Sequence, residues 1–302
     1  MQAMILAGGF GTRISEESVV RPKPMVEIGG MPILWHIMKI YSYYGVNDFI
    51  ICCGYKGHII KEWFANYLHK SADVTFDFRT NETEVHSTQI EPWRVTLADT
   101  GENTMTGGRI KQAAQYLTGE TFFLTYGDGV SDVDIGASLR FHQAHGKKAT
   151  MTAVQPDQRF GVFTLASGEN LVSHFREKPK GDAVWTNAGF FVLDRSVIDY
   201  VEGDDSVWEA EPMQRLVEDG QLVANRHQGF WQPMDNLHDK NTLEDIWATG
   251  DAPWKRTGSA LQIMRTPPVQ AQESPVAGVG RMSTIRASSS RDSASWNRIA
   301  GA

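Results

Sequence analysis

The chain has 302 residues, of which 41% are hydrophobic and 22% are charged. This is ordinary globular composition, and the length allows one large α/β domain or two smaller ones. Asp and Glu outnumber Lys and Arg by 36 to 29, so the formal net charge is -7. Wholesale disorder, fibrous repeats and a general attraction to nucleic acid or to an anionic membrane are therefore excluded.

The two cysteines, Cys52 and Cys53, are adjacent in an apolar stretch. Neighbouring cysteines rarely form a disulfide because the geometry is strained, and two cysteines cannot build a cysteine-rich zinc site. The first residues lack the basic and apolar regions of a signal peptide. No apolar run approaches the ~20 residues of a membrane-spanning helix. We therefore expect a cytoplasmic protein.

In the first half of the chain, short apolar runs alternate with amphipathic runs. The apolar runs predict buried strands at 3–7, 48–53, 121–126 and 149–154. The amphipathic runs predict helices at 31–44, 59–68, 110–117 and 135–145. This alternation predicts an α/β fold with parallel strands, right-handed crossovers and helices on both faces of the sheet. Two further extended segments, 74–78 and 93–98, are interpreted as an inserted hairpin within about 73–105.

The second half has more strand pattern. We expect strands at 161–165, 171–176, 188–193 and 222–226, and helices at 195–201, 210–218 and 240–248. After residue 255 the apolar periodicity disappears, and the sequence becomes rich in serine and arginine but poor in acidic residues. We predict one folded domain over residues 1–255 and a basic, low-complexity, poorly ordered tail over 256–302.

A glycine-rich turn follows the first strand, with the sequence Leu6-Ala7-Gly8-Gly9-Phe10-Gly11-Thr12-Arg13. Glycines let the backbone approach a ligand closely and direct its N–H groups at an anion. The turn begins like a dinucleotide fingerprint, but Ile14 stands where the third glycine belongs. The glycines alone would equally suit a tight turn without a ligand. Arg13 favours a phosphate, because a guanidinium group pairs well with one.

Three charged residues could join this turn. Lys23 lies between two prolines, which fix the backbone around it. Asp128 follows the strand at 121–126 in a Gly-Asp-Gly turn, at the strand end where open α/β sheets bind ligands. Asp235 follows another extended segment. The two carboxylates could hold Mg²⁺ together with substrate phosphates, although each residue alone is an ordinary turn or loop residue.

Two later stretches could bind a sugar phosphate, Phe175-Arg176-Glu177-Lys178-Pro179 and Trp185-Thr186-Asn187-Ala188-Gly189. The Glu177 and Asn187 side chains can hydrogen-bond sugar hydroxyl groups, and Lys178 can neutralise a phosphate. Gly189 allows a ligand to approach closely. Read alone, these stretches are a charged loop and the start of a strand.

In this order and spacing the motifs resemble those of the sugar-1-phosphate nucleotidyltransferases, over roughly residues 2 to 255. That family has Gly-x-Gly-Thr-Arg, then Pro-Lys-Pro, a Gly-Asp metal turn, Glu-Lys-Pro, Asn-Ala-Gly and a late metal-binding Asp. The tail after residue 255 departs from the family pattern. The stretches most similar to members that use CTP and glucose 1-phosphate are 33–38, 53–57, 106–109, 125–129 and 229–235.

The resemblance implies a Rossmann-like, mixed and mostly parallel sheet flanked by helices, with a smaller sugar-binding β part. It implies Mg²⁺-dependent transfer of CMP from CTP to α-D-glucose 1-phosphate, giving CDP-glucose and pyrophosphate. It further implies a homo-oligomer in a bacterial cytoplasm that serves lipopolysaccharide O-antigen synthesis.

The resemblance also implies roles for individual residues. Lys23 and Arg13 would be catalytic, and Asp128 and Asp235 would bind the metal. The residues expected to bind the nucleotide are Leu6, Ala7, Gly8, Gly9, Gly11, Thr12, Arg13, Lys23, Thr106, Gly107, Arg109 and Asp128. Those expected to bind the sugar phosphate are Tyr126, Gly127, Glu177, Lys178, Asn187 and Gly189. The loop 104–109 is the expected reader of the base.

Two alternatives stay open at this stage. The enzyme could use UTP or dTTP, or another hexose 1-phosphate, which a panel of nucleotides would separate. The chain could instead be a non-catalytic sugar-nucleotide sensor on the same fold, since fold alone does not fix function. A sensor would be expected to lose a metal carboxylate or the signature lysine. The presence of Asp128, Asp235 and Lys23 therefore favours an enzyme.

Overall fold

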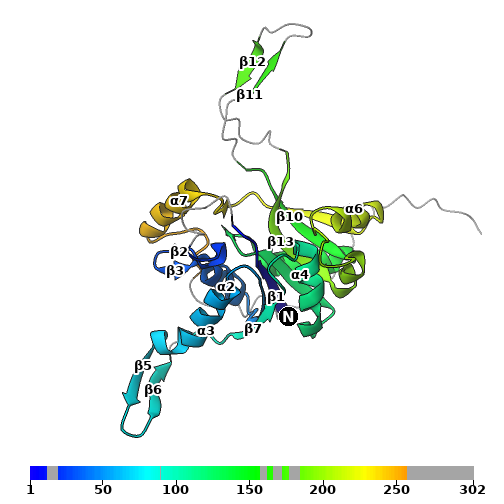
Figure 1. Cartoon of the computed structure of the whole chain (residues 1–302). Coiled ribbons are helices and arrows are strands. Elements are labelled where there is room, and N and C mark those ends of the chain that lie inside the picture. The colour runs from blue at the N-terminus through cyan, green and yellow to red at the C-terminus, as the bar shows by residue number, and fades with distance from the viewer. Residues whose placement is uncertain (12–19, 89, 157–161, 166–171, 177–183, 257–302) are drawn as a thin grey trace, which may run out of the picture. The chain divides into compact units, whose positions relative to one another are not determined.

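The computed structural model describes residues 1–11, 20–88, 90–156, 162–165, 172–176 and 184–256 (Figure 1). All of these belong to one compact unit, residues 1–266. The expected tail, apart from Arg256, lies outside the described residues.

A seven-stranded sheet in the order β14-β10-β13-β8-β1-β4-β7 forms the centre of this unit. Its strands are β1 (Gln2–Ala7), β4 (Asp48–Cys53), β7 (Arg94–Asp99), β8 (Thr121–Tyr126), β10 (Ala149–Val154), β13 (Thr186–Asp194) and β14 (Leu222–Arg226). Neighbouring strands are parallel except at β13, which runs antiparallel to both β8 and β10. The predicted mixed, mostly parallel sheet is confirmed.

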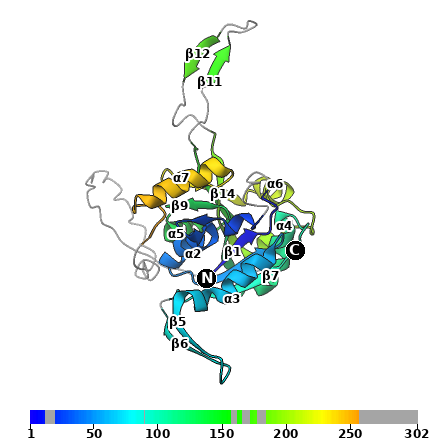
Figure 2. The same ribbon diagram turned by 60° about the vertical axis from the view of Figure 1, so that its left-hand side comes forward.

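Strand β1 shows why the sheet is buried on both faces. Ala3 and Ile5 belong to one hydrophobic cluster, and Met4 and Leu6 belong to another. Successive side chains of a strand point to opposite faces, so each face needs its own cover. Helices α2 (Ile33–Tyr43), α3 (Gly57–Ser71), α5 (Ile135–His145) and α7 (Leu237–Ala248) contribute to the first cluster; α4 (Thr106–Ala113), η4 (Arg195–Tyr200) and α6 (Glu211–Glu218) contribute to the second (Figures 1 and 2).

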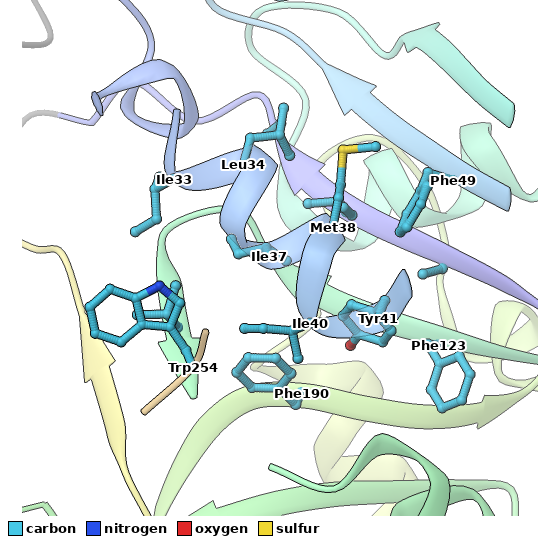
Figure 3. Packing of buried hydrophobic residues seen from close by; sticks show 14 of the residues in the cluster. Ile33, Leu34, Ile37, Met38, Ile40, Tyr41, Phe49, Phe123, Phe190 and Trp254 are labelled. Carbon is cyan, nitrogen blue, oxygen red and sulfur yellow. The ribbon is translucent and has the colours of Figure 1, made fainter. Parts of the chain in front are cut away.

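Helix α2 packs its apolar side chains against the face of the sheet that the first cluster covers. Ile37, Ile40 and Tyr41 are fully buried, and they lie over Phe123 of β8 and Phe190 of β13 (Figure 3). Burying one large apolar side chain stabilises a fold by about 1.5–3 kcal/mol. This packing therefore fixes the two strands whose ends carry the candidate site.

Several helix boundaries differ from the prediction, and two of these differences have a visible cause. The helix expected at 31–44 begins at Ile33, because β3 (Met31–Pro32) pairs with β2 (Glu27–Ile28). The helix expected at 110–117 begins at Thr106 and continues as the 3-10 turn η3 (Ala114–Tyr116). The backbone N–H groups of Gly107 and Gly108 donate to the carbonyl of Ser206 at 2.8 and 3.2 Å. This partner is about a hundred residues away, so no local pattern shows it.

The pairing of the expected inserted hairpin was wrong. Strand β5 (Ala72–Asp77) pairs with β6 (Glu82–Thr88), whereas residues 94–99 form β7, the parallel edge strand next to β4. Val95 and Leu97 of β7 pack against the first cluster. The tertiary partner of this short run decides its pairing, and periodicity alone cannot supply that partner.

Short pairs complete the description. Strand β11 (Val162–Leu165) pairs with β12 (Val172–Arg176), and β9 (Gly129–Ser131) pairs with β15 (Trp231–Pro233). A 3-10 turn, η2, spans Lys23–Met25. Across the described part of the chain, no helix has both the length and the apolar character needed to span a membrane.

Candidate active site

Two neighbouring pockets lie where β1 and β8 end. The first has a volume of about 410 Å³ and is lined by the glycine turn, Lys23, the segment 102–106 and the end of β8. The second, of about 260 Å³, is lined by residues of β8, β13 and β15. Tyr126 and Asp128 line both pockets. A ligand could therefore extend from one pocket into the other past these two side chains.

The turn after β8 depends on a glycine. Leu6 and Tyr126 are register partners in the parallel pair β1–β8, so the two strands end side by side. The N–H of Gly127 donates to the carbonyl of Leu6 at 3.0 Å, and a Cβ at position 127 would lie 2.7 Å from that same oxygen. Only glycine allows this approach. It brings the following residue, Asp128, to the mouth of the glycine turn.

A small antiparallel pair brings the two candidate metal carboxylates together. Strands β9 and β15 pair Gly129 with Pro233, and the N–H of Met234 donates to the carbonyl of Asp128 at 2.8 Å. Asp128 precedes the first strand and Asp235 follows the second, so both carboxylates emerge at the same end of the pair. The next residue, Asn236, caps helix α7 through the N–H of Asp239.

Lys23 connects these two carboxylates. Its Nζ lies 2.6 Å from Oδ2 of Asp128 and 2.8 Å from Oδ1 of Asp235. The lysine side chain is only 10% exposed. Burial alone would lower the pKa of Lys23, but the two carboxylates outweigh burial and raise the pKa above its ordinary value. Lys23 is therefore a fixed positive charge at neutral pH.

The carboxylate pair suits a divalent cation that also binds phosphate. Both carboxylates approach one cationic group within 2.8 Å, so their oxygens converge on a single point. In the described ranges, no group of three or more His, Cys, Asp or Glu side chains is placed to hold a metal. Mg²⁺ is commonly held by one or two carboxylates plus substrate phosphates and water, and this donor set fits that pattern.

Arg109 is buried beneath the glycine turn. Its guanidinium donates to the carbonyl oxygens of Gly8 (3.0 Å), Gly101 (2.6 Å) and Glu102 (3.0 Å), and to the Thr100 hydroxyl (2.8 Å). Burial lowers the pKa of Arg109 from its ordinary value. A Cβ at position 8 would lie 2.3 Å from Nη1 of this arginine. The turn therefore needs glycine at this position, and Arg109 ties it to the segment 100–102.

Further hydrogen bonds connect side chains that line the first pocket. The N–H of Trp208 donates to the Thr106 hydroxyl at 2.9 Å, and that hydroxyl donates to Oε2 of Glu209 at 2.7 Å. The Tyr126 hydroxyl accepts from Nδ2 of Asn187 at 2.9 Å. Burial, followed by the nearby charge of Glu209, raises the pKa of Tyr126.

Asn187 and Gly189 shape the second pocket. Oδ1 of Asn187 accepts from the N–H of Gly189 at 2.8 Å, which fixes the orientation of the amide. Gly189 has a φ of +79°, and a Cβ there would lie 2.4 Å from the Tyr126 ring. The indole N–H of Trp231 donates to the carbonyl of Ala188 at 2.8 Å and joins β15 to this wall.

The structure brings most of the predicted residues together. Those lining the first pocket are Leu6, Ala7, Gly8, Gly9, Gly11, Lys23, Thr106, Arg109, Tyr126, Gly127 and Asp128, and those lining the second include Tyr126, Asp128, Asn187, Gly189 and Asp235. Gly107 lies in the first turn of α4, with its N–H bonded to Ser206. Thr12, Arg13, Glu177 and Lys178 lie outside the described residues, and their roles stay predictions.

Sequence reasoning missed Glu209. This residue lines the first pocket and follows the fully buried Trp208 in the connection before α6. The only signal was a Trp-Glu pair ahead of an amphipathic helix, which matches no ligand-binding pattern. The expected base-reading loop 104–109 is also only partly a loop, since α4 begins at Thr106.

Ligand pockets at the carboxyl edge of an open sheet are typical of nucleotide-binding α/β proteins. Sequence comparison makes the class specific: the chain belongs to the nucleotidyl transferase family, which it matches over residues 2–249.

Named relatives and solved structures agree with this assignment. The chain is 59% identical over 256 residues to the glucose-1-phosphate cytidylyltransferase of Salmonella typhimurium, covering 84% of this chain and 99% of that protein. It is 44% identical, with the same coverage, to a Bacillus subtilis protein named a probable glucose-1-phosphate cytidylyltransferase. Its fold matches that of a UDP-glucose pyrophosphorylase complexed with UDP-glucose, with a TM-score of 0.59 and 13% identity over 82% of this chain and 98% of that one.

Proposed function

We propose that this protein transfers CMP from CTP to α-D-glucose 1-phosphate, producing CDP-glucose and pyrophosphate. The high identity to the Salmonella glucose-1-phosphate cytidylyltransferase supports this substrate pair. The observation that carries the proposal is the cluster of Lys23, Asp128 and Asp235, with contacts of 2.6 and 2.8 Å, beside the glycine turn. This cluster combines a fixed cation with a carboxylate pair, as phosphate transfer requires.

In the reaction, an oxygen of the sugar phosphate attacks the α-phosphorus of CTP in line. The new oxygen–phosphorus bond forms while the bond between the α-phosphorus and its bridging oxygen breaks, and pyrophosphate leaves with that electron pair. The second pKa of a sugar phosphate is about 6, so the attacking group is already largely a dianion at pH 7. The protein therefore needs no general base, and it contributes positioning and charge stabilisation.

The residues around the two pockets divide this work. The backbone from Gly8 to Gly11 would hold the nucleotide phosphates, and Lys23 would stabilise the negative charge that develops at the α-phosphate. Asp128 and Asp235 would hold Mg²⁺, which supplies charge neutralisation on the phosphate oxygens when bound. Arg109 would act by fixing the shape of the turn, since its guanidinium bonds to Gly8 and to the segment 100–102.

The second pocket would receive glucose 1-phosphate. Asn187 is held with its amide fixed, and Gly189 allows the Tyr126 ring to pack directly against the backbone. Glu177 and Lys178 would complete this subsite, and Thr12 and Arg13 would complete the phosphate site. We further propose that the enzyme is a homo-oligomer of a bacterial cytoplasm, and that its CDP-glucose supplies the dideoxyhexoses of lipopolysaccharide O-antigen.

Pyrophosphate release tests the proposal. The protein is incubated with glucose 1-phosphate and Mg²⁺, and CTP, UTP, dTTP, ATP and GTP are offered separately. We expect strong release with CTP alone, and a loss of about two to three orders of magnitude in Asp128→Asn. Asp245→Asn, an exposed carboxylate of α7, is the matched control and should keep wild-type activity. Preference for UTP or dTTP would contradict the assigned nucleotide, and tight nucleotide binding without release would indicate a sensor.

A further inference from the structure

The connection from η4 to α6 presents a carboxylate to the first pocket. Glu209 lines the pocket together with Thr106 and Tyr126, and its side chain is exposed there. The only other acidic side chains lining this pocket in the described ranges are Asp128, which contacts Lys23, and Glu102. Glu209 therefore needs its own explanation.

Glu209 is held firmly in place. The preceding Trp208 is fully buried, and the carbonyl groups of Asp204 and Ser206 accept from backbone N–H groups of Met105 and Gly107, each at 2.8 Å. A Cβ at Gly108 would lie 2.5 Å from the Cα of Asp204, which shows how closely the connection packs on α4. The carboxylate is thus positioned by backbone contacts, as a specificity-determining group should be.

The Glu209 carboxylate has acceptor positions left for a ligand. The Thr106 hydroxyl accepts from the N–H of Trp208, so its own hydrogen is directed at Oε2 of Glu209. The Tyr126 hydroxyl accepts from Asn187, so its hydrogen is likewise available to Glu209. An ionised carboxylate has about four lone-pair positions, so these two donors leave acceptor capacity facing the pocket.

The charge of Glu209 decides which part of a nucleotide it meets. A carboxylate repels phosphate groups, and the phosphates are drawn to Lys23 beside Asp128 and Asp235. Glu209 must therefore face the nucleoside. Cytosine carries an exocyclic amine that donates hydrogen bonds, whereas uracil carries a carbonyl at the same position. A fixed acceptor favours the amine and opposes the carbonyl.

We propose that Glu209 is the specificity-determining residue for the base, with its carboxylate accepting a hydrogen bond from the 4-amino group of cytosine. This inference rests on the proposed function of the same site. The base is then selected by α4 and the connection before α6 together, and not by the loop 104–109 alone. Thr106 and Tyr126 are positioning residues for this carboxylate.

A nucleotide that lacks only the amine gives a test in the wild-type protein. We would compare kcat/KM for CTP, for UTP and for the 4-deamino analogue of CTP, which carries hydrogen at C4. Losing a hydrogen bond to a charged group should lower kcat/KM for the analogue by about 10-fold or more relative to CTP. UTP should be poorer still, because its carbonyl faces the carboxylate. Equal use of CTP and the analogue would overturn the inference without any variant.

Glu209→Gln then assigns the effect to this side chain. We expect kcat/KM for CTP to fall about 10- to 100-fold, while the value for the 4-deamino analogue stays within about threefold. The CTP-to-UTP ratio should narrow, since an amide can turn its NH₂ group toward the uracil carbonyl. Glu211→Gln, an exposed carboxylate two residues further on that pairs with Arg215, is the matched control. Thr106→Val should give a smaller loss that is again confined to CTP.

Several results would overturn the inference. An equal loss with CTP and with the analogue would make Glu209 a general structural residue. If Glu209→Gln lowers kcat/KM for CTP but not for 2′-deoxy- or 3′-deoxy-CTP, Glu209 contacts the ribose. If Glu209→Gln leaves kcat/KM for CTP unchanged, Glu209 does not bind the nucleotide. If no nucleotide is turned over, the proposed function is wrong; calorimetric binding of CTP and of the analogue to wild type and to Glu209→Gln then decides the role of Glu209.

Discussion

Two groups of side chains around the first pocket, called here the charged end and the hydrogen-bonded end, are built in different ways. In the first group, Lys23 of η2 joins Asp128, which follows β8, and Asp235, which follows β15, through direct ion pairs of 2.6 and 2.8 Å. In the second group, the Glu209 carboxylate accepts a hydrogen bond from the Thr106 hydroxyl, which itself accepts from the N–H of Trp208, and Tyr126 lies close by.

This difference separates two tasks of a nucleotide site. The charged end serves the phosphates, which every nucleoside triphosphate shares, so it supports turnover but cannot distinguish bases. The hydrogen-bonded end meets the nucleoside, where one donor or acceptor decides the fit. Damage at the first end should therefore lower turnover with every nucleotide, and damage at the second should change the preference among them.

Replacing Lys23 by Gln is the strongest test of the charged end. It removes the cation that stabilises the α-phosphate, so kcat should fall about two to three orders of magnitude. Steady-state kinetics measure this fall. Lys61→Gln, an exposed lysine 3.5 Å from Asp99, is the control. A loss below tenfold would contradict the assigned role.

Arg109→Lys tests the support of the glycine turn. Lysine cannot reproduce the planar fork that reaches the carbonyls of Gly8, Gly101 and Glu102. Hydrogen bonds to charged groups contribute about 1.5–3 kcal/mol each, so the free energy of unfolding should fall by about 2–4 kcal/mol. Urea denaturation measures this fall, and KM for CTP should rise more than kcat changes. Arg215→Lys, on the exposed side of α6, should leave both values unchanged.

Gly108→Ala disturbs the hydrogen-bonded end without touching a charge. The new Cβ would lie 2.5 Å from the Cα of Asp204, so the connection that carries Glu209 must move. We expect a loss of about 1–3 kcal/mol in unfolding free energy and a weaker preference for CTP over UTP. Gly203→Ala has open space around its Cβ and is the control. An unchanged CTP-to-UTP ratio would show that the connection does not set the preference.

His36 of α2 allows a milder test, away from the charged groups. Its Nε2 donates to the carbonyl of Ile28 at 2.8 Å, and burial lowers the pKa of His36 to about 4. The unfolded chain, with a His pKa near 6.5, therefore binds this proton first, so the stability is present above about pH 7 and is lost as pH falls toward 4. Between pH 7 and pH 5.5 the loss from this group should be about 1 kcal/mol.

Urea unfolding at several pH values measures that loss. His36→Gln should show a shallower decline over the same pH range, because the variant has no imidazole to protonate at this position. A decline as steep as that of the wild type would assign the acid sensitivity to other groups.

Much of the fold was predictable because its signals are local. The strands at 48–53, 121–126 and 149–154 match β4, β8 and β10 residue for residue, since each is a short apolar run that ends at a turn. The pairing of residues 93–98 was not predictable, because the edge of β4 that receives β7 is created only when the sheet assembles. The start of α4 was missed for a similar reason, since its first N–H groups are satisfied by Ser206.

The candidate site divides in the same way. Lys23, Asp128 and Asp235 could be proposed because their motifs follow the order and spacing of a known family, although each residue alone is an ordinary turn or loop residue. Glu209 could not be proposed from the sequence. Its neighbours in the fold, Thr106 and Tyr126, are about a hundred and about eighty residues away in the chain. A carboxylate after a tryptophan carries no local signal, and only the packing of the connection on α4 places it in the pocket.

The adjacent cysteines have a practical consequence. Cys52 and Cys53 are both free and buried within the sheet, and burial raises the pKa of both thiols, that of Cys53 to about 11. Since the thiolate is the reactive form, both should resist maleimide reagents at neutral pH. A single cysteine introduced at the exposed Asp205 would then carry a fluorescent dye selectively. Movement of the connection beside Glu209 could be followed in an otherwise native chain.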